Sequence, residues 1–209
     1  MKKIAVLVSG GGTNLQALID AQARGMIVNG EISAVISSAP GAYALERAKN
    51  AGIPGYVLPR RDYPSSQAMT AALVELLKRL SINVVVMAGF MTIVTKELFE
   101  EYNHAVINIH PALIPSFAGP GCYGLHVHEK ALAYGVKVSG ATVHFVTEEC
   151  DSGPIILQKA VDVLPGDTPE TLQRRIMEQC EWKLLPQAVS LFCQDRLRVE
   201  GRTVRILET

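Results

Sequence analysis

The sequence lacks long apolar runs, an excess of charge of either sign and closely spaced cysteine pairs, and each absence excludes a class of protein. The apolar stretch 84–88 is far shorter than the roughly 20 residues that a membrane span requires. Lys plus Arg and Asp plus Glu each number 20, which leaves no net charge for tracking a nucleic acid backbone. The four cysteines show no C-x-x-C spacing and lack the density of a disulfide scaffold. We therefore expect a cytoplasmic protein that binds neither a membrane nor a nucleic acid.

Short β-branched runs alternate with helical patterns in the first half of the chain. Strands are expected at 4–8, 32–37, 55–58, 84–88 and 105–109, and helices at 14–24, 42–51, 65–80 and 96–101. This alternation predicts right-handed βαβ units in a mostly parallel, twisted sheet with helices on both faces. The first apolar run ends at Ser9, so we expect a strand there and not a signal peptide. A chain of 209 residues is near the size of one domain, and we expect a single domain.

The second half has a different character, with two long strands followed by a long helix. The runs 139–147 and 155–164 predict an antiparallel pair at the C-terminal edge of the sheet. Thr168 has the chemistry of a helix cap and Pro169 suits the first helical position, so a long helix is expected to begin here. Residues 200–201 predict the turn of a terminal hairpin.

The segment Ser9 to Leu15, with the sequence SGGGTNL, joins the first expected strand to the first expected helix. At such a junction, free backbone N–H groups and the helix dipole can receive an anion. The loop lacks both the third glycine of a dinucleotide fingerprint and the Gly-Lys-Ser/Thr of a nucleoside triphosphate loop. Glycines at a strand-to-helix turn can be purely structural, but three in a row exceed what the turn needs. We interpret the loop as a phosphate monoester site formed by Gly11, Gly12, Thr13 and Asn14.

Two further motifs carry reactive groups: Asn108-Ile109-His110-Pro111 and Asp151-Ser152-Gly153-Pro154. Alternate residues share a face of a strand, so Asn108 and His110 are expected to point the same way. The proline after His110 ends the strand, and open α/β sheets bind ligands at the carboxyl ends of their strands. An amide donor, an imidazole and a carboxylate that can hold the imidazole charged are the groups that acyl transfer needs. Either motif alone also fits an ordinary turn.

Two neighbouring residues are expected to be structural. His144 alternates out of phase with the presumed site, which favours a packed strand histidine. Cys150 precedes Asp151, whose negative charge disfavours a thiolate. We therefore expect this cysteine to have a packing role.

Together these motifs resemble the phosphoribosylglycinamide formyltransferase family. The resemblance covers nearly the whole chain and rests on residues 9–15, 88–91, 108–115, 140–151 and 153–158. It implies a Rossmann-like formyltransferase fold, with a phosphate-binding βαβ half in residues 1–110 and the catalytic loop, edge strands and C-terminal helix in residues 111–209. It also implies transfer of a formyl group from 10-formyltetrahydrofolate to phosphoribosylglycinamide, without a metal, in purine biosynthesis and one-carbon metabolism. We expect a monomer or homodimer.

The resemblance also assigns roles to residues. Asn108 would donate to the oxyanion, and His110, held protonated by Asp151, would relay a proton to the departing folate nitrogen. The ribonucleotide phosphate would bind Gly12, Thr13 and Asn14, and Glu181 would contact its glycinamide end. The folate would contact Phe90, Met91, Thr92, Ile93, Val94, Asn108, Thr147 and Asp151. From the residues alone, Glu181 is a solvated helix residue and the apolar run 90–94 is ordinary core.

The chain departs from the family pattern at two positions and in one loop. Ser66 and Thr92 stand where the family commonly carries arginine, which affects how the acidic tail of the folate is bound. Arg60 and Arg61 lie nearby in sequence and are candidates to replace it. The segment 116–123 is part of an extended loop directly after the catalytic strand. We expect it to be a mobile cover over the substrates, and the alternative is a passive surface loop.

Three other functions are compatible with parts of this pattern. A formyltetrahydrofolate deformylase would use the same three polar residues with water as acceptor, but such family members carry an additional regulatory domain. A methionyl-tRNA formyltransferase would carry a tRNA-binding domain, and neither domain is expected in these residues. A non-catalytic sensor of a phosphate ligand would have no need of Asn108, His110 and Asp151 together.

Overall fold

The five strands expected in the first half are present and lie side by side in one sheet. The structure is a computed structural model that describes residues 1–208. The strands are β1 (Lys2–Val8), β2 (Gly30–Ser37), β3 (Gly55–Val57), β4 (Val84–Met87) and β5 (Val106–His110). They pair in parallel in the order β3-β2-β1-β4-β5, which confirms the expected βαβ units.

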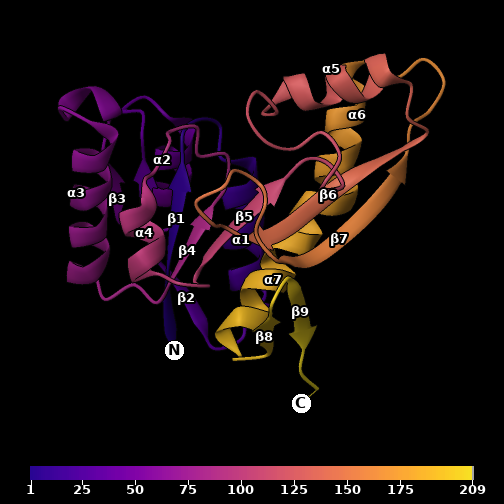
Figure 1. Cartoon of the computed structure of the whole chain (residues 1–209). Helices are drawn as coiled ribbons and strands as arrows, with labels where there is room; N and C mark the ends of the chain where they lie inside the picture. Colours follow the sequence, from indigo (N-terminus) through magenta and orange to yellow (C-terminus); the bar gives the residue numbers. More distant parts are fainter. Residues whose placement is uncertain (209) are drawn as a thin grey trace.

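Helices pack on both faces of the sheet (Figure 1). On one face lie α1 (Thr13–Ala23) and α2 (Tyr43–Asn50), whose buried side chains join one apolar core. On the other lie α3 (Ser66–Arg79), α4 (Lys96–Glu101) and the 3-10 helix η1 (Arg60–Asp62). Coverage on both faces explains why the central strands β1 and β4 are continuous apolar runs and do not alternate.

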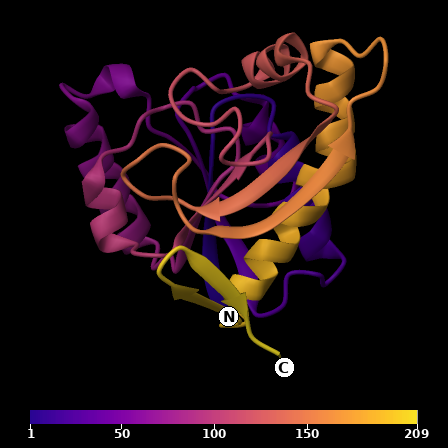
Figure 2. The same ribbon diagram turned by 45° about the vertical axis from the view of Figure 1, so that its right-hand side comes forward.

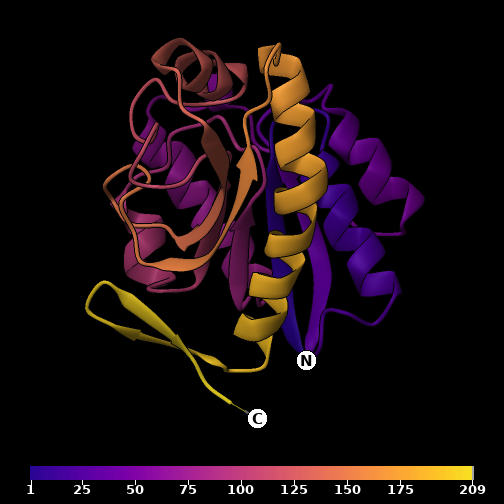
Figure 3. The ribbon, with the colours of Figure 1, turned by 90° about the vertical axis from the view of Figure 1, so that its right-hand side faces the viewer.

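The second half extends the same sheet with antiparallel strands. β6 (Val138–Phe145) pairs with β5, and β7 (Ile155–Asp162) pairs with β6. A terminal hairpin of β8 (Leu197–Glu200) and β9 (Thr203–Ile206) joins the far side of β7. The antiparallel C-terminal edge is thus confirmed, although the hairpin and not β7 forms its outermost part. The hairpin projects from the body of the molecule (Figures 2 and 3).

The helix expected from Pro169 is present, with an irregularity in its middle. It consists of α6 (Pro169–Ile176), the π-helical turn η2 (Met177–Glu181) and α7 (Trp182–Cys193), which run on as one long rod (Figure 3). Thr168 caps it by accepting a hydrogen bond from the Thr171 N–H at 3.3 Å. Single π-helical turns inside α-helices often occur at functional sites, and this one ends at Glu181.

One helix was not expected from the sequence. α5 (Leu125–Tyr134) follows the extended loop and lies at the end of the sheet toward which β1 points (Figure 1). It buries only Val127, His128 and Ala131, so its apolar periodicity is weak. No helix in residues 1–208 combines the length and apolar character needed to cross a bilayer.

Candidate active site

His110 lies at the carboxyl end of β5, beside the carboxylate of Asp151. Its Nδ1 is 3.5 Å from Asp151 Oδ2, and the two side chains are 4% and 10% exposed. Its Nε2 donates to the Phe117 carbonyl at 2.8 Å, so this nitrogen carries a proton. Asp151 lies in the turn between β6 and β7 with a left-handed φ of +53°. Two motifs that are distant in sequence are therefore brought together, as expected.

His144 belongs to the same cluster, and the expectation that it points away is wrong. It lies directly opposite Asn108 in the antiparallel β5–β6 pair, and directly opposed residues share a face of the sheet. Its Nε2 is 3.2 Å from Asn108 Nδ2 and 3.7 Å from Asp151 Oδ1. The error arose because alternation along one strand does not reveal which residue of its partner lies opposite.

The protonation of His144 fixes the orientation of the Asn108 amide. Burial lowers the pKa of His144 and outweighs the opposing effects of the Phe145 carbonyl and the Asp151 carboxylate, which keeps the ring neutral. Its Nδ1 donates to the Phe145 carbonyl at 2.9 Å, so Nε2 is the acceptor. Asn108 therefore presents its NH₂ group to the ring, and its second N–H can be donated to another acceptor. His144 is a positioning residue for this amide.

The unexpected helix α5 brings one more histidine near the cluster. His128 is fully buried, and within residues 1–208 neither of its ring nitrogens has a hydrogen-bond partner. Burial and, to a lesser extent, the nearby His110 lower the pKa of His128 to about 4. A neutral imidazole therefore lies near His110. Gly124 and Gly135, which flank this helix, were the available sequence signal for its ends.

The Ser9–Leu15 loop leads from β1 into α1, as expected. Gly12 caps α1 with a φ of +71°, and a Cβ there would lie 2.6 Å from the Ala44 Cβ of α2. Its glycine is required for backbone conformation and for packing of α1 against α2. A Cβ at Gly11, in contrast, would meet no atom within 4 Å. The Arg47 guanidinium donates to the Gly11 carbonyl at 2.8 Å and places a positive charge beside the loop.

Glu181 is not a solvated helix residue, because its side chain is turned into the protein. It is 6% exposed and accepts a hydrogen bond from Asn14 Nδ2 at 2.6 Å. Burial raises the pKa of Glu181 to about 7, against the opposing effect of the Asn14 hydrogen bond. The buried Oδ1 of Asn14 has no partner within residues 1–208. Acceptor atoms therefore gather beside the glycine loop, where they suit a ligand that carries N–H donors.

The apolar run after β4 is partly core and partly surface. Phe90 and Val94 pack against the core beneath α3 and α4. Met91 and Ile93 are 55% and 78% exposed, so they offer apolar surface to solvent or to a ligand. The Met91 N–H donates to Ser9 Oγ at 2.8 Å, so the run adjoins the start of the glycine loop. An exposed apolar wall therefore lies next to the polar loop.

Arg60 is held beside Ser66, one of the two positions that depart from the family pattern. Its Nε donates to Ser66 Oγ at 3.1 Å, and its Nη1 donates to the Tyr63 carbonyl at 2.7 Å. Arg61 is 78% exposed and lies 3.8 Å from Asp62. Of the two candidate arginines, Arg60 is therefore the one that lies against Ser66, where the family commonly carries arginine.

The turn between β6 and β7 carries Thr147, Cys150 and Asp151. Thr147 Oγ1 lies 3.1 Å from Ser152 Oγ, which ties the two ends of the turn together. Cys150 is exposed, so the expected packing role is wrong. Partial burial and, next, the Asp151 carboxylate raise the pKa of the Cys150 thiol to about 11. The expectation that the acidic neighbour disfavours a thiolate is confirmed.

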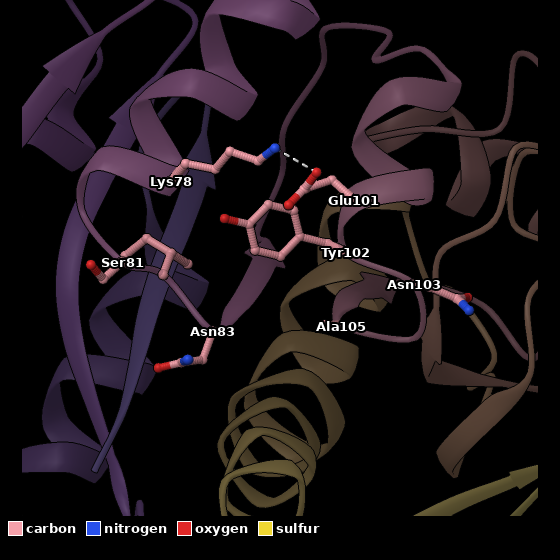
Figure 4. Close-up of a pocket in the computed structure, with 8 residues that line it drawn as sticks. Lys78, Ser81, Asn83, Glu101, Tyr102, Asn103 and Ala105 are labelled. Carbon is pink, nitrogen blue, oxygen red and sulfur yellow. Dashed lines mark ion pairs between the residues drawn. The ribbon is translucent and has the colours of Figure 1, made fainter.

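Two surface pockets lie outside the cluster of His110, Asp151, Asn108 and His144. The first lies at the amino-terminal ends of β4 and β5, where Lys78 and Glu101 form an ion pair at 2.6 Å (Figure 4). Because His110 stands at the carboxyl end of β5, this pocket is at the wrong end of the sheet for the cluster. The second lies between α1 and α7, with Thr13 and Trp182 among its lining residues. Neither contains the polar cluster described above.

Comparison with known proteins identifies the class that this fold and cluster define. Residues 2–189 match the family model described as formyl transferase. The chain is 40% identical to the phosphoribosylglycinamide formyltransferase of Haemophilus influenzae, over 96% of this chain and 91% of that protein. The crystal structure of glycinamide ribonucleotide transformylase 1 from Symbiobacterium toebii is 46% identical with a TM-score of 0.94, over 100% of this chain and 95% of that one. The chain belongs to the formyl transferase family and, within it, to the phosphoribosylglycinamide formyltransferases.

Two other similar proteins are longer than this chain. The trifunctional purine biosynthetic protein adenosine-3 of Drosophila pseudoobscura pseudoobscura is 44% identical over 94% of this chain, which spans only 14% of that protein. The crystal structure of a formyltetrahydrofolate deformylase from Pseudomonas syringae pv. tomato is 30% identical with a TM-score of 0.86, over 99% of this chain and 66% of that one. The fold is thus shared by transferases and a deformylase, and the choice between them depends on the site.

Proposed function

We propose that this protein transfers the formyl group of 10-formyltetrahydrofolate to the amine of phosphoribosylglycinamide, a step of purine biosynthesis. The products are formylglycinamide ribonucleotide and tetrahydrofolate. The observation that carries the proposal is the convergence of Asn108, His110 and Asp151 at the carboxyl end of β5. The glycine loop follows β1 at the same end of this parallel sheet, so a phosphate ester and a reacting formyl group would share one end of the fold.

The three polar side chains account for the chemistry without a metal ion. Attack of the amine on the formyl carbon gives a tetrahedral intermediate with an oxyanion. The Asn108 N–H that His144 does not use is donated to this oxygen. His110 supplies a further N–H and relays a proton to the departing folate nitrogen, while Asp151 faces its other ring nitrogen.

The ribonucleotide occupies the side of the site formed by α1 and η2. Its phosphate lies on the N–H groups of Gly11, Gly12, Thr13 and Asn14, which precede or begin helix α1. The open space around Gly11 allows close approach to the backbone. Glu181 and the free acceptor oxygen of Asn14 receive the N–H groups of the glycinamide end. In this arrangement residues 1–110 supply most of the phosphate subsite.

The folate lies against the exposed wall after β4 and against Thr147 and Asp151 of the turn before β7. Met91 and Ile93 offer apolar surface to the pterin ring, and Thr92, Thr147 and the backbone around them offer polar contacts. Phe90 and Val94 support this wall from the core. Arg60, fixed against Ser66, is the cation that meets the acidic tail.

The acceptor subsite favours a transferase over a hydrolase. A deformylase needs room for water only, and it has no use for a buried carboxylate whose burial is energetically costly. Here Glu181 is 6% exposed, with a pKa raised to about 7, and it is paired with a residue of the glycine loop. A buried carboxylate with this energetic cost is typical of a site where a ligand uses the group.

The decisive experiment measures release of tetrahydrofolate from 10-formyltetrahydrofolate with and without phosphoribosylglycinamide, and identifies the formylated product by mass spectrometry. We expect release that depends on the ribonucleotide and equals the formylated product in amount. Equal release without the ribonucleotide would establish a deformylase. Binding of the ribonucleotide with no release under either condition would establish a sensor.

We further propose that the protein works in the cytoplasm as a monomer or homodimer. The four cysteines show no C-x-x-C spacing and lack the density of a disulfide scaffold, which fits a reducing compartment. Light scattering coupled to size-exclusion chromatography distinguishes the two assemblies, and a larger species would contradict both.

A further inference from the structure

Two of the four thiols lie on segments that meet at the Asp151 carboxylate. We call residues Ser116–Tyr123 the cover loop; it contains Cys122, whereas Cys150 directly precedes Asp151. Asp151 Oδ2 accepts a hydrogen bond from the Gly119 N–H of the cover loop at 3.0 Å, and the Cys150 thiol donates to the same oxygen at 3.6 Å. The Cys122 N–H in turn donates to the Gly119 carbonyl at 3.0 Å. The Cys150 thiol is therefore bonded directly to this carboxylate, and the Cys122 backbone is linked to it by two hydrogen bonds through Gly119.

Burial and then the Asp151 carboxylate account for most of the raised pKa of Cys150, and Cys122 contributes least. The proximity of the two segments is shown by the hydrogen bonds at Gly119 and Asp151. The charged groups next to the two thiols differ in sign. The Lys130 ammonium lies 3.3 Å from Cys122 Sγ and is anchored on the Gly121 carbonyl at 2.9 Å. Reactive cysteines are typically found beside such cations and partly exposed. Cys150 instead faces a carboxylate that can accept its proton.

The cover loop also binds His110, which is the acid of the proposed mechanism. The Phe117 carbonyl accepts the proton of His110 Nε2 at 2.8 Å, the atom that the reaction needs to donate elsewhere. Formyl transfer therefore requires this contact to break. Phe117, Gly119 and Gly121 have φ values of +51°, +86° and +76°, and glycines in this region have alternative conformations within reach. A bond that ties the loop down would keep His110 engaged.

We propose that a hydroperoxide such as hydrogen peroxide converts Cys122 and Cys150 into a disulfide, and that this bond locks the cover loop onto His110 and stops turnover. Formation of the disulfide depends only on the two thiols and the hydroperoxide. The loss of turnover rests on the proposed formyl transfer. No residue of the catalytic or substrate-binding set is consumed, so reduction restores the enzyme.

The chemistry balances with peroxide as the only oxidant. Cys122 loses its proton, the resulting thiolate attacks one peroxide oxygen, and the O–O bond breaks to give sulfenic acid and hydroxide. This hydroxide takes up the proton that Cys122 lost and becomes water. The Cys150 sulfur then attacks the sulfenic sulfur, forming the S–S bond and breaking the S–O bond. The thiol proton passes through the Asp151 carboxylate to the departing hydroxide, which leaves as water. Overall, two thiols are oxidised and one peroxide is reduced to two water molecules.

The remaining thiols provide an internal control. Cys180 and Cys193 are 0% and 2% exposed, and both lie in the apolar core around α7. Burial raises the pKa of each thiol, to about 11 for Cys193. Because they are shielded from solvent, they are expected to stay reduced while Cys122, which is partly exposed, and Cys150, which is exposed, react.

The first test is peptide mapping after treatment of the purified protein with hydrogen peroxide. Digestion without reductant should give one linked peptide containing Cys122 and Cys150, lighter than its two parts by about 2 Da. The peptides containing Cys180 and Cys193 should remain alkylatable. Absence of the linked peptide, or equal oxidation of the buried pair, would overturn the disulfide whatever the enzyme's activity.

The second test follows turnover through the same treatment in the wild type, Cys122→Ser and Cys150→Ser. We expect nearly complete loss of turnover in the wild type, with full recovery in dithiothreitol. The serine variants should retain untreated activity and should not acquire the reductant-reversible block. Formation of the linked peptide without loss of turnover would refute the locking role, and an unchanged block in Cys122→Ser would assign the inhibition to another site.

Discussion

The ribonucleotide side and the catalytic side of the site differ in what holds their polar groups. On the ribonucleotide side, Asn14 of α1 and Glu181 of η2 bond directly to each other. On the catalytic side, His110 is fixed on β5, but its Nε2 is bonded to Phe117 in a loop with several left-handed residues. Regular elements set a geometry before a ligand binds, whereas such a loop can exchange partners. The comparison teaches that the acceptor subsite is preformed, while the proton donor must be released before it acts.

The largest effect is expected from removing groups on the catalytic side. Asn108→Ala and His110→Ala should each lower kcat by about 10²–10³-fold, because an oxyanion donor or the proton relay is lost. Ribonucleotide affinity, measured by calorimetry, should change little because Asn14 and Glu181 are untouched. His104→Asn is the control, since His104 is exposed, has a φ of +50° that asparagine tolerates, and precedes β5 at its other end. Near-normal kcat in either alanine variant would contradict the mechanism.

The next effect tests the charge of Asp151 separately from its shape. Asp151→Asn keeps a residue that tolerates the φ of +53° and an oxygen for the Gly119 N–H. It removes the negative charge beside His110, so we expect kcat to fall about 10²-fold while the melting temperature stays close to that of the wild type. Steady-state kinetics and calorimetric melting check this. Unchanged kcat would mean that Asp151 acts only by holding the cover loop.

A pair of glycine variants separates ligand approach from packing on the ribonucleotide side. Gly11→Ala adds a methyl group with no neighbour within 4 Å, so it should weaken ribonucleotide binding by about tenfold through contact with the phosphate and leave folate binding and stability unchanged. Gly12→Ala is the matched contrast, because its Cβ meets Ala44 and its φ is left-handed, and it should lower stability. Calorimetric titration with each ligand distinguishes them. Equal loss of both ligands in Gly11→Ala would mean that the turn itself had collapsed.

The last prediction concerns stability and not turnover or affinity, namely the cost of the buried acceptor. The pKa of Glu181 is raised from 4.5 to about 7 in the folded protein, so folding favours the protonated form. Its contribution to stability is therefore fullest below pH 4.5 and declines as the pH rises through about 7. Glu181→Gln avoids this decline and keeps an oxygen for Asn14. Relative to the wild type, it should gain up to roughly 3 kcal/mol at pH 8 and almost nothing at pH 4.5.

Denaturant unfolding of both proteins at the two pH values measures this difference. The same variant should bind the ribonucleotide more weakly at pH 8, because the carboxylate that receives the glycinamide N–H groups is gone. A variant less stable than the wild type at pH 8 would show that the Glu181 charge is compensated within the fold.

The parallel half of the fold could be predicted because its signals are local. β1 is a short apolar run before the first helical pattern and β4 is one between two such patterns, and such runs have few other stable arrangements. Helix α5 could not be predicted in this way, because it buries three residues and its ends depend on Gly124 and Gly135 in a glycine-rich region. Its position is set by packing at the end of the sheet, which no local pattern encodes.

The site residues likewise divide into those that a local sequence pattern predicts and those that only packing between distant segments determines. Asn108 and His110 share one strand, so their common face follows from its alternation. His144 joins them only through the register of β6 against β5, and the burial of Glu181 depends on a π-helical turn. Both are products of pairing and packing between segments distant in sequence. The Glu181 assignment came from resemblance to a family, and the position of His144 was predicted wrongly.

The central claim, a preformed acceptor subsite beside a proton donor released by the cover loop, is tested most directly by hydrogen exchange of backbone amides. Exchange should be followed in the free protein and with both substrates or their non-reactive analogues bound. We expect residues 13–16 and 177–181 to be protected already in the free protein. Residues 116–124 should exchange faster than these, because their bonds to His110 and Asp151 open transiently, and should become protected over both bound ligands. Slow exchange of the cover loop in the free protein, or ordering of α1 and η2 only on ligand binding, would contradict the claim.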